Sequence, residues 1–290
     1  MKILLLGANG QLGTDILVEN ERRGLFDIFR VGRDVVDLSF AGQATDNLSS
    51  LDFDVMVNCT GYHRTDEAEN NETLAIAVNT RAVGELAVLC ARKKARFIHV
   101  STDYVFGGGA ECSPIPERAM KAPLNVYGRT KSDGEDLALT SHDDSLVIRV
   151  ASLFGLAGAS GKGGNFVETM IRLGRERGKL RVVNDQHMSP TGTQDVAAAM
   201  LALIEKRASS GIYHVVNTGV ASWCDFARRI IERANVSAEV EGISTAEFPT
   251  PARRPPYSAL DNQKTVSIVG RMAPWEEALD RYLIGKGYRH

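Results

Sequence analysis

Residues 2–13 read KILLLGANGQLG, and this stretch decides the fold. A short apolar run leads directly into three glycines spaced Gly-x2-Gly-x2-Gly, and an amphipathic pattern follows them. Glycine lets a backbone turn sharply and approach a phosphate group, and the N-terminus of the following helix offers unpaired N–H groups. A glycine trio alone could be an ordinary tight turn, but its place between a strand and a helix favours a dinucleotide site. The expected contacts are Gly7, Asn9, Gly10, Gln11 and Leu12.

The first half of the chain continues this alternation of apolar runs and helical periodicity. Strands are expected at residues 2–7, 28–32, 54–59, 96–101 and 145–153, with helices at 11–23, 74–93 and 127–139. The runs are almost continuously apolar, as expected of strands covered by helices on both faces. The pattern predicts a Rossmann-type α/β fold with a doubly wound parallel sheet.

The second half is less regular. A glycine-rich loop at 155–164 precedes expected helices at 166–177, 194–207, 222–234 and 274–284 and strands at 180–185 and 211–216. No clean linker separates the halves. We therefore expect an NAD(P)-binding domain over residues 1–155 and a smaller substrate-binding lobe over 156–290 that is partly interleaved with the sheet.

Composition narrows the class of protein. The 290 residues include 34 Lys and Arg against 36 Asp and Glu, so the net charge of −2 provides no field that would hold a nucleic acid. The cysteines Cys59, Cys90, Cys112 and Cys224 are scattered and form no zinc-binding pattern. The apolar run at residues 3–6 is too short for a signal peptide or a membrane span. A cytoplasmic protein without a membrane or nucleic-acid partner is expected.

The cofactor type is left open by the residues after the second expected strand. Asp34 and Asp37 could accept hydrogen bonds from an adenosine ribose, whereas Arg33 could hold a 2′-phosphate. NADPH or NADH is therefore expected, with Arg33 favouring NADPH slightly.

A second group of residues indicates the chemistry. Thr102 lies at the carboxyl end of the fourth expected strand, where such sheets bind ligands. Tyr127 and Lys131 are four residues apart and share one face of a helix. A nearby cation would lower the pKa of the phenol toward neutrality, and Thr102 could orient a carbonyl oxygen. The Tyr-x3-Lys spacing is common by chance, but together with the glycine turn it predicts that Thr102, Tyr127 and Lys131 are catalytic.

These residues resemble the dTDP-4-dehydrorhamnose reductase family of the extended short-chain dehydrogenase/reductase superfamily. The likeness runs through nearly the whole chain. The motifs that carry it are 7–13, 62–69, 101–106, 127–131, 164–167, 185–186, 189–192, 211–214 and 249–255.

The resemblance implies an enzyme that uses NADPH or NADH to reduce the C4 ketone of a nucleotide-linked 4-keto-6-deoxy sugar. Tyr127 would deliver the proton, Lys131 would hold the nicotinamide ribose, and Thr102 would position the ketone. Further cofactor contacts are expected at Arg33, Asp37, Leu38, Thr60, Tyr62 and Asn79. Substrate contacts are expected at Asp103, Tyr104, Phe106, Asn165, Pro190, Thr191 and Arg254, with Arg254 facing the diphosphate.

Departures from the family pattern leave alternatives open. Ser152 replaces a Trp that is frequent in the family, so the sugar and the nucleotide base stay undetermined. Gln194 replaces a Glu that helps some members bind magnesium, and no metal is expected. A related epimerase, or a non-catalytic NAD(P)-binding regulatory subunit, is the alternative function, and a monomer or homodimer is expected. His99, within an apolar strand, is expected to be a core histidine.

Overall fold

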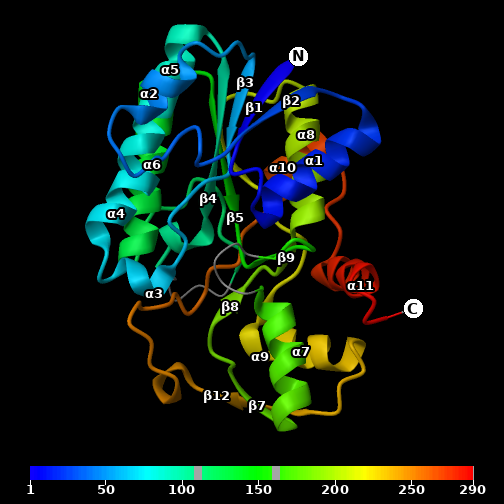
Figure 1. The fold of residues 1–290 in the computed structure, drawn as a ribbon. Coiled ribbons are helices and arrows are strands. Elements are labelled where there is room, and N and C mark those ends of the chain that lie inside the picture. Colours follow the sequence, from blue (N-terminus) through cyan, green and yellow to red (C-terminus); the bar gives the residue numbers. More distant parts are fainter. Residues whose placement is uncertain (108–112, 159–163, 290) are drawn as a thin grey trace.

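The structure is a computed structural model that describes residues 1–107, 113–158 and 164–289 (Figure 1). Cys112 and residues 159–163 of the expected glycine-rich loop lie outside the described residues. A six-stranded parallel sheet forms the centre, in the order β10-β5-β4-β3-β1-β2. Its strands are β1 (Lys2–Leu6), β2 (Asp27–Val31), β3 (Val55–Asn58), β4 (Arg96–Thr102), β5 (Ser145–Val150) and β10 (Gly211–His214). The doubly wound parallel sheet predicted from the sequence is confirmed.

Helices cover both faces of the sheet because successive strand side chains point to opposite sides. Ile3 and Leu5 pack in one apolar core, and Leu4 and Leu6 pack in the other. The first core is closed by α1 (Gln11–Arg23) and α8 (Thr193–Glu205), with α10 (Gln263–Val269) beside α8. The second is closed by α2 (Gln43–Leu48), α5 (Ala82–Lys93) and α6 (Val126–Ser141). Figure 1 shows these two groups of helices on opposite sides of the sheet.

The helical stretch Glu72–Lys93 is long and apolar enough to cross a membrane by length and composition. It consists of α4 (Glu72–Ile76), a π-helix (Ala77–Arg81) and α5. Half of its most apolar window is buried, and Val83, Leu86 and Leu89 pack in the core under the sheet. The need to fill this core explains why the stretch is apolar.

The smaller lobe lies at the lower end of the molecule in Figure 1. Its apolar core contains Phe154, Met170, Phe226 and Trp275. Its larger elements are α7 (Phe166–Arg177), β7 (Lys179–Val183), α9 (Trp223–Arg233), β12 (Glu239–Ile243) and α11 (Trp275–Gly285). The short elements of the chain are α3 (Thr65–Ala68), a 3-10 helix (Asp103–Val105), β6 (Leu153–Phe154), β8 (His187–Met188), β9 (Thr191–Gly192), β11 (Ala221–Ser222) and a 3-10 helix (Thr245–Glu247).

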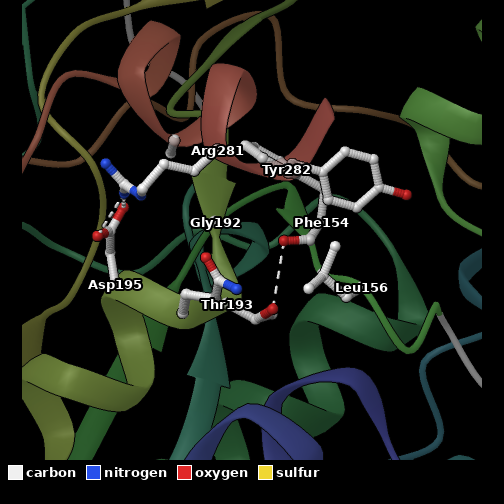
Figure 2. A pocket seen from close by; sticks show the side chains of 10 residues that line it. Phe154, Leu156, Gly192, Thr193, Asp195, Arg281 and Tyr282 are labelled. Carbon is white, nitrogen blue, oxygen red and sulfur yellow. Dashed lines mark hydrogen bonds and ion pairs between the residues drawn. The ribbon is translucent and has the colours of Figure 1, made fainter. Parts of the chain in front are cut away.

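The two lobes are joined by closely packed strands and helices, shown in Figure 2. β6 pairs with β9, and Arg281 on α11 forms an ion pair with Asp195 on α8 at 2.5 Å. The Thr193 hydroxyl donates to the Phe154 carbonyl at 3.3 Å. The cavity among these residues is about 10 Å³, which is room for one water at most. β10 and α8 come after residue 155 in the chain but belong to the sheet and to the helices that cover it. The two lobes are therefore interleaved, and a domain boundary at residue 155 stays a prediction.

Candidate active site

The glycine turn between β1 and α1 has the shape that a phosphate site requires. Gly7 has a φ of 79°, and a Cβ at Gly13 would lie 2.3 Å from the Gly7 carbonyl oxygen. Gly10 precedes α1, and no side chain of the described residues caps the helix there. Side chains would therefore block the turn, and the first N–H groups of α1 remain available for an anion. Leu12 is buried as an anchor, whereas Asn9 is exposed.

This turn lies at the point where the chain reverses its winding direction. β1 and β3 are neighbours in the sheet, but the chain leaves them toward opposite faces. Ligands of doubly wound sheets bind in the crevice at such a point. Gln11 borders it, and its buried carbonyl oxygen has no hydrogen-bond partner within the described part of the chain. The residues present fit a dinucleotide.

The turn after β2 places Arg33 on the surface, together with Asp34. Asp37 accepts hydrogen bonds from the Ser39 backbone N–H at 2.9 Å and the Ser39 hydroxyl at 2.7 Å, and these bonds lower the pKa of Asp37. The Leu38 side chain is buried in the core. Its side chain is therefore not free to contact a cofactor.

Asn79 organises the segment after β3. It lies in the π-helix and is fully buried, not on a helix surface. Its Oδ1 accepts from the Tyr62 N–H at 2.8 Å, and its Nδ2 donates to the Tyr62 carbonyl at 3.1 Å and to Thr130 Oγ1 at 3.1 Å. Asn79 thus fixes the backbone of Tyr62 against α6. A single π turn within a helix is often found at functional sites.

Thr102 and Tyr127 meet at the carboxyl end of β4. α6 begins close to the 3-10 helix Asp103–Val105, since a Cβ on Gly128 would lie 2.2 Å from the Tyr104 carbonyl oxygen. This approach places the Tyr127 side chain near Thr102. Burial raises the pKa of Tyr127 to about 12, although the neighbouring Thr102 hydroxyl opposes the increase. The direction is opposite to the lowering expected from the Tyr-x3-Lys spacing, and the phenol keeps its proton at neutral pH.

Lys131 lies one turn further along α6 and is buried. Its Nζ donates to the Val100 carbonyl at 2.6 Å and is 2.9 Å from Nε2 of His99. Burial lowers the pKa of Lys131 to about 8, against the opposing charge of Glu135. The expected core histidine His99 is fully buried and is the direct neighbour of this amine, which periodicity alone did not reveal.

Asp103 is a buried carboxyl group next to Thr102. It accepts from the Thr102 hydroxyl at 3.0 Å and from the Ser258 hydroxyl at 2.5 Å. Burial raises the pKa of Asp103 to about 6, and both hydroxyl contacts oppose that increase. Ser258 comes from the second half of the chain and was not among the predicted residues.

Arg254 approaches the same place from the other lobe. It binds both carboxylate oxygens of Asp66, at 2.5 and 2.7 Å, and its guanidinium lies near the Tyr104 hydroxyl. The Tyr104 and Tyr127 rings are 5.9 Å apart and nearly perpendicular. Arg254 therefore connects the segment before α6 with the tyrosine pair, although 188 residues separate it from Asp66.

The other predicted substrate residues lie deeper in the protein. Phe106 packs against the Arg149 guanidinium and the His214 ring. Asn165 caps α7 and also donates to Gly155 O and to the Tyr282 hydroxyl. Pro190 and Thr191 are buried, and the Thr191 hydroxyl donates to the Ser189 carbonyl. These contacts favour structural roles for the side chains of Phe106 and Asn165.

Within residues 1–107, 113–158 and 164–289, no three or more His, Cys, Asp or Glu side chains are grouped so that they could hold a metal ion. Gln194 is exposed at the start of α8, next to the Asp195–Arg281 ion pair.

Comparisons with known proteins agree with this geometry. The family described as RmlD substrate binding domain matches residues 1–286. A dTDP-4-dehydrorhamnose reductase of Mycobacterium tuberculosis is 36% identical over 96% of this chain and 91% of its own length. A crystal structure of a dTDP-4-dehydrorhamnose reductase from Clostridium acetobutylicum superposes with a TM-score of 0.92 at 32% identity, covering 99% of this chain and 100% of that one. The Bacillus anthracis enzyme in complex with NADP gives 0.89 at 34% identity, covering 98% and 99%.

Proposed function

We propose that this chain, which belongs to the RmlD substrate binding domain family, reduces the C4 ketone of a nucleotide-linked 4-keto-6-deoxy sugar. The reaction is of the type that converts dTDP-4-dehydro-L-rhamnose to dTDP-L-rhamnose, a step in the synthesis of deoxysugar precursors. The protein is an oxidoreductase of the extended short-chain dehydrogenase/reductase superfamily that uses NADPH or NADH. NADPH is favoured by Arg33 and by the NADP complex of the B. anthracis relative.

The observation that carries the proposal is the proximity of Tyr127 to Thr102 at the carboxyl end of β4. Burial keeps the Tyr127 phenol protonated at neutral pH, so it is prepared to donate a proton to a developing alkoxide. The Thr102 hydroxyl can hold the same oxygen and stabilise its charge. Reduction of a ketone adds a hydride to the carbon and a proton to the oxygen, and this arrangement can supply and position that proton.

The proposed cofactor and catalytic residues follow the carboxyl ends of strands of the same sheet, where ligands of doubly wound sheets bind. The reduced nicotinamide, when bound, supplies the hydride. Lys131 would hold the nicotinamide ribose beside Tyr127. The remaining cofactor contacts are proposed at Gly7, Asn9, Gly10, Gln11, Leu12, Arg33, Asp37, Leu38, Thr60, Tyr62 and Asn79.

The substrate site is proposed between the two lobes. We assign Asp103, Tyr104 and Arg254 to it, because Asp103 and Arg254 both influence the Tyr104 phenol, and Pro190 and Thr191 would shape its far side. Arg254 is already oriented by a bidentate pair with Asp66. The same planar group can bind a diphosphate through two parallel hydrogen bonds. We also propose that the protein acts in the cytoplasm as a monomer or homodimer.

The experiment follows the absorbance of NADPH or NADH in the presence of dTDP-4-dehydro-L-rhamnose and other nucleotide 4-keto-6-deoxy sugars. The wild-type protein is expected to oxidise the cofactor stoichiometrically. Tyr127→Phe should reduce turnover by about 100-fold or more because it removes the proton donor, with cofactor affinity nearly unchanged. Tyr288→Phe, near the C-terminus, is the matched control and should retain turnover.

Two results would contradict the proposal. Tight cofactor binding without oxidation by any sugar nucleotide would favour a non-catalytic regulatory subunit. Interconversion of sugars without net consumption of the reduced cofactor would favour an epimerase.

A further inference from the structure

The surroundings of Lys131 are specified by a line of buried polar residues on β3 and β4. Asn58 and His99 are directly opposite each other in the register of these strands and are both fully buried. Asn58 Nδ2 is 3.2 Å from His99 Nδ1, and His99 Nε2 is 2.9 Å from Lys131 Nζ. The positions of the hydrogens along this line determine whether Lys131 donates or accepts.

The orientation of the Asn58 amide is fixed at the far end of the line. Asn58 Oδ1 is 3.0 Å from the Thr60 backbone N–H and 2.5 Å from its hydroxyl. A backbone N–H can only donate, so the carbonyl side of the amide must face Thr60. The NH₂ side therefore faces His99 and donates to Nδ1.

The tautomer of His99 follows from this donation. Burial and the neighbouring Lys131 hold the pKa of His99 well below its usual value, so the ring is neutral. A neutral imidazole that accepts at Nδ1 carries its proton at Nε2. That N–H points at the Lys131 amine.

An ammonium group has three donors and no acceptor. If Lys131 were charged, its N–H groups and the His99 Nε2–H would face each other at 2.9 Å. A neutral amine accepts from His99 and still donates to the Val100 carbonyl at 2.6 Å. The hydrogen bonds of the line are all satisfied only in the second state.

We propose that Thr60, Asn58 and His99 form a directed hydrogen-bond chain that presents the His99 Nε2 proton to Lys131. His99 is then a positioning residue that disfavours the charged form of Lys131 in the protein without cofactor. Its relevance to catalysis rests on the proposed function, whereas the direction of the chain does not.

The other groups around Lys131 do not offset the preference for a neutral amine that the His99 N–H creates. Glu135, one turn along α6, is the carboxylate that opposes it, but both Glu135 oxygens are bound by Arg149 at 2.7 and 2.8 Å. The Cys59 thiol at the end of β3 is neutral, because burial raises its pKa to about 12. Tyr127 on the same helix is also neutral. With its pKa lowered to about 8, Lys131 can lose its proton at a lower pH than an ordinary lysine does.

The first test reads the tautomer directly. Protein labelled with ¹⁵N-histidine, without cofactor or substrate, is recorded by two-bond ¹H–¹⁵N correlation at pH 9, above the Lys131 pKa of about 8, and the His99→Gln variant identifies the signal among the six histidines. The proposal expects His99 to be protonated at Nε2 and unprotonated at Nδ1. A ring protonated at Nδ1, or at both nitrogens, would overturn it.

The second test reverses the direction of the hydrogen bonds from position 58 to Lys131. In Asn58→Asp the carboxylate accepts from Thr60 and from His99, so the His99 proton moves to Nδ1 and Nε2 becomes an acceptor for a charged Lys131. The midpoint of Lys131, followed by the ¹³Cε shift of labelled lysine, should rise by about one pH unit or more. The alkaline limb of kcat/KM should move in the same direction. Asn47→Asp, an exposed site on α2, is the matched control and should change neither.

An unchanged His99 tautomer and Lys131 midpoint in Asn58→Asp would contradict the proposal. If that variant does not fold, the wild-type tautomer decides. Both nuclear magnetic resonance measurements are made without substrate, so they remain informative even if no sugar nucleotide is reduced.

Discussion

Replacing Glu135 by glutamine tests the buried ion pair beside the catalytic helix. Glu135 on α6 and Arg149 on β5 are 0% and 1% exposed, and the guanidinium donates to both carboxylate oxygens at 2.7 and 2.8 Å. Glu135→Gln keeps the size of the side chain but removes its charge. One of its amide N–H groups then faces the guanidinium.

The expected cost is large because Arg149 cannot lose its charge or reach water. Its remaining partners are neutral: the Glu117 carbonyl at 3.2 Å, His214 Nε2 at 3.3 Å, and the Phe106 ring at 4.9 Å from Cζ. Breaking a buried pair by removing one partner costs about 3–5 kcal/mol. That is a substantial part of the roughly 5–15 kcal/mol that stabilises a typical protein.

Urea unfolding followed by circular dichroism measures this loss. With an m value of about 3 kcal/mol/M, the midpoint should fall by about 1–1.7 M. Glu176→Gln removes the exposed partner of Arg172 on α7 and is the matched control, with an expected change below about 0.5 kcal/mol. Replacing both Glu135 and Arg149 by apolar residues should cost less than the sum of the single changes.

A change of less than about 1 kcal/mol in Glu135→Gln would refute the reasoning, since it would mean that Arg149 is solvated or finds another counter-charge. Additive costs in the double variant would refute it as well, because residues that act as a pair are not additive.

Three further predictions concern the site. Arg33→Ala should weaken NADPH binding about tenfold and leave NADH binding unchanged, because one charge-assisted hydrogen bond to the 2′-phosphate is lost. Equal effects on the affinity for both cofactors in binding titrations would show that Arg33 does not contact that phosphate. Ser258→Ala should destabilise the protein by about 1–3 kcal/mol at pH 8, where Asp103 is ionised. The loss should be smaller at pH 5, because the raised pKa of about 6 leaves Asp103 protonated there. Equal shifts of the urea midpoint at both pH values would contradict this. Gly128→Ala should lower turnover and thermal stability together, because its Cβ would lie 2.2 Å from the Tyr104 carbonyl oxygen; wild-type values of both would contradict the assigned close approach.

Elements with a clear local pattern of apolar residues and glycines could be predicted from the sequence. The strand, glycine turn and helix at the N-terminus follow from adjacent residues, and the shared face of Tyr127 and Lys131 follows from the helical period. The structure has both. The apolar run expected at 145–153 is divided, because Ser152 adopts a φ of 44° between β5 and β6. The mixed polar strand β12 and the short helix α10 had no periodic signal long enough to be recognised.

The parts that the sequence did not predict depend on distant pairing. His99 adjoins Lys131 because α6 packs against β4. Asn58 lies opposite His99 because β3 and β4 pair in one register. Arg254 meets Asp66 across 188 residues. Burial also reverses the expected direction of the Tyr127 pKa. Each of these depends on the tertiary arrangement, which periodicity cannot reveal.

The return of the chain to the sheet has a consequence for folding during synthesis. α1 packs against α8, and β10 completes the sheet beside β5. At about 5–20 residues per second, the ribosome makes residue 214 roughly 10–40 s after the first strand. Until then, the apolar face of α1 and the open edge of β5 have no native cover. We therefore expect the nascent N-terminal half to be the species that depends most on chaperones.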